Sequence, residues 1–176
     1  MASDNQIRNA LNRARKAIEL RPSFALGTMK TSTRLENGLK CVSNNGDWSF
    51  EMDEPTAAGG ENSAPSPGVY GLGALTGCVA MSIKSLAILT NVTIRAIDVD
   101  AEGDFDDRGF FQMGGVPPGY KEFRLNIDVD SPAPIERVRE VVEEALKVST
   151  WFNVFSRGQE VNVNISVSAD AEAAAG

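Results

Sequence analysis

Cys78 is the residue of this chain with the clearest chemical potential, and it lies inside a long uncharged stretch. No charged side chain occurs between Val69 and Ile83, and apolar or small residues cover every face of this segment when it forms a helix. The second cysteine is Cys41, and the chain has no histidine. Because a cysteine thiolate is a nucleophile, Cys78 is the first candidate for covalent or redox chemistry.

The lack of histidine narrows that chemistry. It excludes Cys-His and Ser-His-Asp nucleophile systems and most zinc and non-haem iron sites. Two cysteines are also too few for a disulfide scaffold. We therefore expect no metal and no cofactor, and any activation of a thiol must come from a carboxylate, lysine, arginine, tyrosine or the other cysteine.

Composition predicts one cytoplasmic domain. A chain of 176 residues with 42% hydrophobic content can bury a single core. Its 17 Lys+Arg against 24 Asp+Glu give a net charge of -7, which argues against nucleic acid as a partner. The N-terminus has no apolar signal-peptide core, and we take the uncharged stretch, soon interrupted by Lys84, to be too short and glycine-rich to span a membrane.

The pattern of the chain predicts an α+β fold. Ser66-Pro67 has the residue types of a helix N-cap and first helical position, so the uncharged stretch is expected to be a central helix packed on all sides. Glu36-Asn37-Gly38 is a hairpin signal. Apolar spacing predicts a second helix that Ser131-Pro132 caps and that runs to Leu146. The other expected elements are an amphipathic docking helix over 3–20, strands over 24–30, 39–42, 48–52, 92–99, 120–129 and 161–167, a loop over 104–119 and a turn over 151–158.

Cys41 and the acidic residues from Asp98 to Asp106 are each expected to have a structural role and no chemical one. Cys41 is expected to be a small apolar residue of a strand. The acidic residues from Asp98 to Asp106 match the first positions of a calcium-binding loop, but Gly109 stands where a bidentate glutamate is required. We therefore expect an acidic turn in solvent. By position, the chain divides into an N-terminal amphipathic helix over 1–22, a main domain over 23–168 and a disordered tail over 169–176.

Several short motifs occur in a set order along the chain: Asp53-Glu54-Pro55, Gly59-Gly60, the Ser66-Pro67 helix start, Cys78, Asp107-Arg108-Gly109-Phe110, Pro118-Gly119-Tyr120 and the helix over 131–146. In the order of its elements and motifs the chain resembles the OsmC/Ohr family of bacterial stress proteins over residues 28–167, so that 23–168 is an OsmC-like domain. The resemblance implies an intertwined homodimer with two antiparallel-rich sheets around two long central helices, and an active site at the dimer interface.

The resemblance also implies a reaction. The best-studied members are thiol peroxidases that reduce organic hydroperoxides in a stress response. The cysteine that matches Cys78 attacks the peroxide and becomes a sulfenic acid, and a second cysteine resolves it to a disulfide. External thiols or dithiols are the reductants.

This chain departs from the family pattern at three positions. Gly68 stands where a glutamate is expected, and Glu36 where an arginine is expected, although Arg34 is close enough to serve if the turn shifts. Ser149 or Thr150 stands at the position of the resolving cysteine, and neither hydroxyl can form a disulfide. Cys41 could replace it only if the two sulfurs approach to about 2 Å.

Cys78 can act as a nucleophile only when its thiol is ionised. A free thiol is only about 3% ionised at pH 7, and burial lowers that fraction. Cys78 lies three turns into its helix, beyond the reach of the helix dipole. We therefore predict a cation beside it, with Arg34 as the candidate activator. Two functions follow: a Cys78 peroxidase for organic or small hydroperoxides, or a non-enzymatic dimeric module that binds a small apolar ligand.

Overall fold

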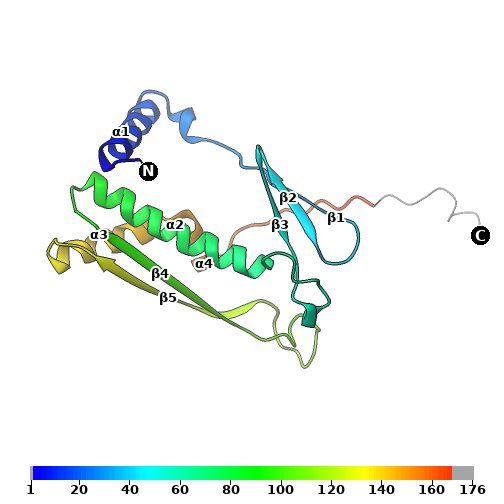
Figure 1. The fold of residues 1–176 in the computed structure, drawn as a ribbon. Helices are drawn as coiled ribbons and strands as arrows, with labels where there is room; N and C mark the ends of the chain where they lie inside the picture. The colour runs from blue at the N-terminus through cyan, green and yellow to red at the C-terminus, as the bar shows by residue number, and fades with distance from the viewer. Residues whose placement is uncertain (1, 168–176) are drawn as a thin grey trace, which may run out of the picture.

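The computed structural model describes residues 2–167, which form an α+β fold of four α-helices and two antiparallel sheets (Figure 1). The α-helices are α1 (Asp4–Leu20), α2 (Pro67–Leu89), α3 (Ile135–Val148) and α4 (Thr150–Ser156). The 3-10 helices are η1 (Pro22–Ala25) and η2 (Thr56–Ala58). The strands are β1 (Ser32–Leu35), β2 (Cys41–Asn45), β3 (Trp48–Met52), β4 (Ala96–Phe105) and β5 (Tyr120–Asp130).

Helix α2 forms the core together with α3 and the sheet of β4 and β5. Four of its five buried residues follow one another at intervals of four positions and are each at most 1% exposed: Leu75, Val79, Ile83 and Ala87. They pack with Val141 and Ala145 of α3 and with the inner side chains of β4 and β5. Burying such side chains stabilises the fold by roughly 1.5–3 kcal/mol each, and this face therefore fixes α2 in place.

The opposite side of α2 is open, which corrects the expectation of a helix packed on all sides. Val69 and Met81 are 59% and 67% exposed. With 23 residues, α2 is also long and apolar enough to cross a bilayer by length and composition, so the expectation that this stretch is too short was wrong. The packing of α2 against α3 and β4 accounts for its apolar character as a core helix.

The two-stranded sheet of β4 and β5 lies under α2 and α3. Val99 pairs with Ile127 and Ala101 with Leu125 on the inner face, whereas acidic side chains alternate with them on the outer face. The acidic stretch beginning at Asp98 is therefore strand and not the predicted turn. Strand β4 starts four residues later than predicted and continues through Phe105.

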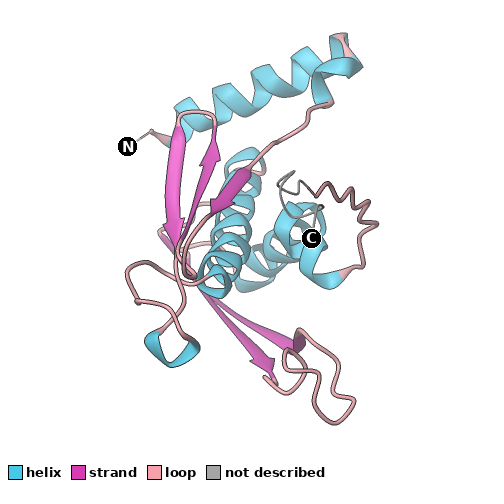
Figure 2. Cartoon of the chain, turned by 90° about the vertical axis from the view of Figure 1, so that its right-hand side faces the viewer, coloured by secondary structure: helices cyan, strands magenta, loops and turns pink. Residues whose placement is uncertain are grey.

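The other sheet has the order β1-β2-β3 and is separate from the first (Figure 2). The hairpin between β1 and β2 turns at Gly38, as Glu36-Asn37-Gly38 predicted, and β3 has the predicted bounds. The strand predicted over 24–30 is wrong, because this segment contains η1 and extended chain without strand pairing.

Two predicted serine caps do not form. Ser66 precedes α2, but its hydroxyl makes no capping hydrogen bond. The Ser131 hydroxyl donates to the carbonyl of Thr93 at 2.6 Å and accepts from the Ala133 N–H at 3.1 Å, so α3 begins only at Ile135. Ser131 thus ties the end of β5 to the segment before β4.

The C-terminal part also differs from the prediction. The expected turn over 151–158 is helix α4. The expected strand over 161–167 has no strand partner in the described chain, and its alternate residues are all more than 70% exposed: Val161, Val163, Ile165 and Val167. The tail predicted over 169–176 lies outside the described residues.

Helix α1 packs against the C-terminal half of α2, and none of its residues is buried. Lys84 of α2 forms an ion pair with Asp4 at 3.1 Å, and Arg8 donates to Asn91 at 2.7 Å. The division of the chain at residues 22 and 168 stays a prediction.

A buried carboxylate organises the loop that enters α2. Asp53 is 1% exposed, and it accepts hydrogen bonds from the Ser63 N–H and hydroxyl, both at 2.9 Å, and from the N–H groups of Glu54 and Glu61. These hydrogen bonds lower the pKa of Asp53 below its usual range, and the bond from the Ser63 N–H has the largest effect. Gly60 packs directly on this loop.

We expect Gly60→Ala to destabilise the fold by at least about 2 kcal/mol, because its added Cβ would stand 2.0 Å from the Glu54 carbonyl oxygen. Gly27→Ala is the matched control, since nothing lies within 4 Å of its added Cβ, and it should change the free energy by less than about 1 kcal/mol. Urea unfolding measures both. Equal stability of the two variants would contradict the packing around Asp53.

Candidate functional site

The candidate site lies where the middle of α2 meets the junction of α3 and α4. The Ser149 hydroxyl donates a hydrogen bond to the Cys78 sulfur at 3.4 Å. Ser149 is 0% exposed, its N–H donates to Ala145, and its carbonyl accepts two hydrogen bonds from Asn153. Ser149, and not Thr150, is therefore the residue that faces Cys78 from the position of the absent resolving cysteine.

Neutral donors act on the Cys78 thiol. Burial raises its pKa, whereas hydrogen bonds from the Ser149 hydroxyl, the N–H groups of Trp151 and Thr150, and the Ser82 hydroxyl lower it. Taken together, the hydrogen bonds outweigh the effect of burial, so the pKa of Cys78 lies below that of an ordinary cysteine. Among described residues, the groups with the largest effect include no cation, which differs from the sequence-based expectation. Donors that bond to the ionised form stabilise it without carrying a charge.

The Cys78 thiol is partly exposed and opens into a groove of about 270 Å³ on the outer side of α2. The groove is lined by Cys78, Met81, Ser82, Ser85, Leu86, Leu89 and Val148. None of these side chains carries a charge apart from the thiolate. A small uncharged molecule can therefore reach the sulfur from solvent along a surface of hydroxyl and apolar groups.

Arg34, the predicted activator, lies elsewhere in the chain. It belongs to β1, its side chain is 82% exposed, and it forms an ion pair with Glu36 at 2.5 Å. Both line a separate cavity of about 420 Å³ beside the hairpin. Within the described chain the structure does not bring Arg34 to the Cys78 groove, and its role stays a prediction.

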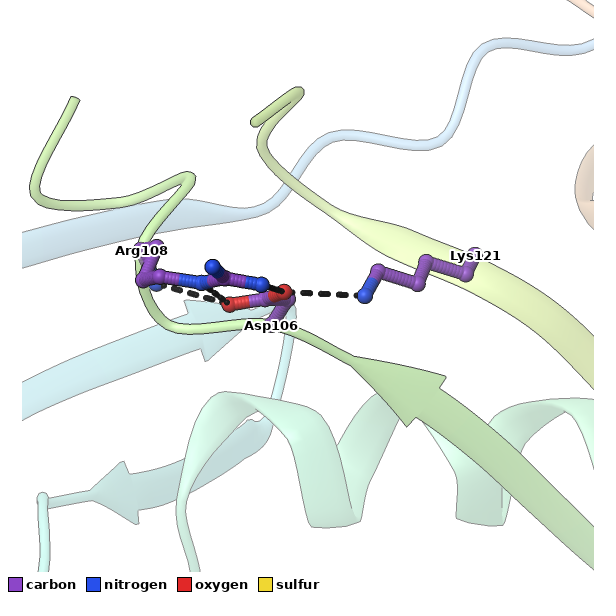
Figure 3. A network of polar contacts seen from close by, with 3 residues as sticks. All are labelled: Asp106, Arg108 and Lys121. Carbon is purple, nitrogen blue, oxygen red and sulfur yellow. Dashed lines mark hydrogen bonds and ion pairs between the residues drawn. The ribbon is translucent and has the colours of Figure 1, made fainter. Parts of the chain in front are cut away.

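Four other basic side chains, Arg108, Lys121, Arg95 and Lys84, are each held by an acidic partner. Arg108 and Lys121 both bond to Asp106 at the end of β4 (Figure 3), with distances of 2.7 and 2.9 Å. Arg95 pairs with Asp130. Lys84 is held by Asp4 and by a backbone carbonyl.

Gly68 stands where the family has a glutamate, and the side chain of Tyr120 fills the space beside it. A Cβ added to Gly68 would lie 3.1 Å from the Tyr120 hydroxyl. Tyr120 in turn packs on Phe123, with ring centroids 4.7 Å apart, and on Phe105 at 6.0 Å. Tyr120 therefore takes up space into which a longer side chain at this position would extend.

Cys41 is not a resolving partner in this structure. It lies in β2 opposite Leu35 and Met52, and both cysteines are free. Among residues 2–167, no group of three or more His, Cys, Asp or Glu side chains is arranged to hold a metal ion.

A further cavity lies near α4, with a volume of about 360 Å³. It is lined by Leu75, Phe123, Leu125, Phe152, Phe155 and Ser156. Five of these six side chains are aromatic or aliphatic, so the cavity suits an apolar ligand.

Sequence reasoning missed the donors around Cys78. Ser82 lies four residues after Cys78 and hence on the same helix face, which was a usable signal. The N–H groups of Thr150 and Trp151 gave no such signal, because their position depends on α4, which was expected to be a turn.

Comparisons with known proteins agree with the fold. Residues 60–164 match the profile of the family described as OsmC-like protein. A search of curated proteins gives no match.

Three solved structures illustrate the similarity. An OsmC-like protein from Mycoplasma pneumoniae is 14% identical with a TM-score of 0.63, over 74% of this chain and 88% of the other. An organic hydroperoxide resistance protein OsmC from Legionella pneumophila is 16% identical, with a TM-score of 0.58 over 74% and 90%. An organic hydroperoxide resistance protein from Elizabethkingia anophelis is 17% identical, with a TM-score of 0.52 over 76% and 90%. At these identities the structures show a shared fold.

The lowered pKa of Cys78 sets the pH dependence of its alkylation. In a Cys41→Ser background, we expect the midpoint of the rate of reaction with iodoacetamide to lie below that of a cysteine peptide, because the folded chain favours the thiolate. Ser149→Ala should raise the midpoint, since it removes a hydroxyl donor. Thr150→Ala keeps its backbone N–H and should leave the midpoint unchanged. A wild-type midpoint equal to that of the peptide would contradict the hydrogen-bond account.

Proposed function

Because this chain belongs to the OsmC-like protein family, we propose that it is a thiol peroxidase that reduces organic or small hydroperoxides through Cys78 in an oxidative stress response. The observation that supports this proposal most is the partly exposed Cys78 sulfur, which faces a groove and receives hydrogen bonds that favour its thiolate. A thiolate is the form of cysteine that attacks a peroxide.

The proposed reaction uses one protein cysteine. The Cys78 thiolate attacks the terminal oxygen of the hydroperoxide, the O–O bond breaks, and the alkoxide leaves and takes up a proton to become an alcohol. Cys78 is thereby oxidised to a sulfenic acid. An external thiol or dithiol then reduces it, which suits the cytoplasm, where reduced thiols persist.

The exposed surface supports a homodimer. The chain exposes 13629 Å², whereas a compact monomer of 18.8 kDa exposes about 8,300 Å². The difference of roughly 5,000 Å² per chain exceeds the roughly 1,000–2,500 Å² that each partner commonly contributes to an obligate interface, so the chain has enough uncovered surface for one. The apolar residues of the segment 161–167 and the open side of α2 are the surfaces that we propose a second copy covers. An activating Arg34 would have to come from that copy, whereas the donors that lower the pKa of Cys78 belong to its own chain and carry no charge.

The alternative is a non-enzymatic dimeric module that binds a small apolar ligand. The cavity lined by Phe123, Phe152 and Phe155 favours this alternative, because its volume and aromatic lining suit an apolar ligand. In that case Cys78 is a core thiol without a reaction.

Consumption of tert-butyl hydroperoxide separates the two functions. With dithiothreitol as reductant, we expect the wild-type protein to consume the peroxide and Cys78→Ser to fall to the uncatalysed rate, because the nucleophile is lost. Cys41→Ser is the matched control and should retain the activity. Equal consumption by wild type and Cys78→Ser would contradict the peroxidase proposal and leave the binding module.

The position of Ser149 predicts that a two-cysteine mechanism can be restored. Its Oγ lies 3.4 Å from the Cys78 sulfur, so a small side-chain movement would bring a sulfur at this position to the disulfide length of about 2.0 Å. We expect Ser149→Cys to form a disulfide with Cys78 after one equivalent of hydroperoxide, detected by intact mass and non-reducing peptide mapping. Thr150→Cys, whose side chain is exposed, should not. A disulfide in Thr150→Cys alone would show that the facing residue was misassigned.

A further inference from the structure

We propose that the N-terminal segment of the chain, which consists of α1, η1 and the extended chain up to residue 30, binds the surface of an anionic lipid bilayer without spanning it. This segment lies outside the two surfaces that a second copy is proposed to cover, the open side of α2 and the apolar residues of 161–167. Binding of this kind does not depend on the chemistry of Cys78.

Positive charge is concentrated in this segment. Residues 1–30 hold two acidic side chains, Asp4 and Glu19, and six basic ones: Arg8, Arg13, Arg15, Lys16, Arg21 and Lys30. The rest of the chain therefore holds 11 of the 17 Lys+Arg and 22 of the 24 Asp+Glu. Asp4 is paired with Lys84 and Glu19 with Arg15, so neither acid neutralises the remaining cations of the segment.

Helix α1 turns its basic face away from α2. Ile7 and Leu11 are partly buried, and α1 packs against α2, which gives the helix its predicted docking role. Lys16 lies half a turn around the helix from Ile7, and Arg13, Lys16 and Leu20 share this outer face through their spacing of three and four residues. Leu20 is 78% exposed. Among residues 2–167 no acidic side chain pairs with Arg13 or Lys16.

Exposed apolar side chains continue from this face into the chain that follows α1. Phe24, Leu26 and Met29 are 60%, 83% and 88% exposed, and within the described chain this stretch pairs with no strand. No acidic residue occurs over residues 20–35. The Arg21 guanidinium lies 4.9 Å from the centre of the Phe24 ring. Such alternation of cations with large apolar side chains is typical of segments that lie in the headgroup region of a bilayer.

A lipid surface fits these side chains better than nucleic acid does. Nucleic acid gains most of its affinity from contacts between cations and phosphates, and it would leave Leu20 and Leu26 in water. An anionic bilayer offers headgroup charge to the cations and hydrocarbon to the apolar side chains. The segment carries both kinds of group.

The distribution of charge also orients the chain on such a surface. The outer face of the sheet of β4 and β5 is acidic, and Asp98 and Asp128 stand opposite each other on it. Helix α1 lies on one side of α2 and this sheet on the other (Figure 1, Figure 2). An anionic surface therefore attracts the side of α1 and repels the side of the sheet.

Co-sedimentation with vesicles tests the proposal on the full chain. The vesicles are phosphatidylcholine alone or phosphatidylcholine with about 30% phosphatidylserine. In about 0.1 M salt we expect the wild-type protein to sediment with the anionic vesicles only, and about 0.5 M salt should weaken this binding. A wild-type protein that does not bind the anionic vesicles, or that binds both kinds equally, overturns the proposal.

Charge reversal on the outer face of α1 tests the role of the cations. Arg13→Glu combined with Lys16→Glu should lower binding to the anionic vesicles at least about twentyfold. Arg137→Glu combined with Arg139→Glu is the matched control, since it makes the same change in net charge on α3 and should keep the wild-type binding. Equal binding by the two double variants overturns the proposal.

A second pair of variants tests the apolar side chains. Leu20→Ser combined with Phe24→Ser should lower binding to the anionic vesicles at least about tenfold, whereas Phe110→Ser combined with Phe111→Ser removes exposed rings elsewhere and should not. Circular dichroism should show all variants folded, because the changed side chains are exposed. Unchanged binding by the first pair overturns the proposal.

Two further measurements separate a lipid surface from other partners. Light scattering should give Leu20→Ser with Phe24→Ser the same mass in solution as the wild type; a lower mass would show that a second copy covers these side chains and would overturn the proposal. Binding of the wild-type protein to duplex DNA at the same salt, without binding to the anionic vesicles, would assign the cations to nucleic acid and would also overturn it.

Discussion

The hydrogen bond from the Ser149 hydroxyl to the Cys78 sulfur is the interaction on which the candidate site depends. It joins the middle of α2 to the junction of α3 and α4, where the main chain of Ser149 is held by Ala145 and Asn153. The hydroxyl is therefore fixed before any substrate arrives. A thiol inside an apolar helix would otherwise stay protonated at neutral pH because burial disfavours its charge. At this site hydrogen bonds from neutral donors outweigh the effect of burial, so the pKa of the thiol is lowered.

The same helix carries the core and the groove, on different faces. Leu75, Val79 and Ile83 bury one face against α3 and β4, whereas the face that carries Cys78 and Met81 remains open. The loop around Asp53 fixes where α2 begins, and the tie between Ser131 and Thr93 fixes how the sheet meets α3. Core packing thus positions the thiol, and the open face supplies access to it.

Local signals in the sequence predicted the elements that depend on few long-range contacts. The turn at Gly38, strand β3 and the start of α2 at Pro67 were found because proline, glycine and alternation act within a few residues. Strand β4 was missed in part, because acidic residues on its outer face suggested a turn. Helix α4 and the N–H donors of Thr150 and Trp151 depend on tertiary contacts of Ser149, which no short pattern encodes. The segment over 161–167 has a strand pattern but no strand partner in the described chain.

Within residues 2–167, neutral hydrogen bonds and not an ion pair lower the pKa of Cys78. The most direct measurement is the ultraviolet titration of the Cys78 thiolate in a Cys41→Ser protein at salt concentrations from about 0.05 M to about 1 M, because salt screens a charge pair strongly and a short hydrogen bond hardly at all. We expect a midpoint below that of an ordinary cysteine that does not move with salt. A midpoint that rises toward the ordinary value as salt increases would contradict the account, since it would reveal a cation beside the sulfur.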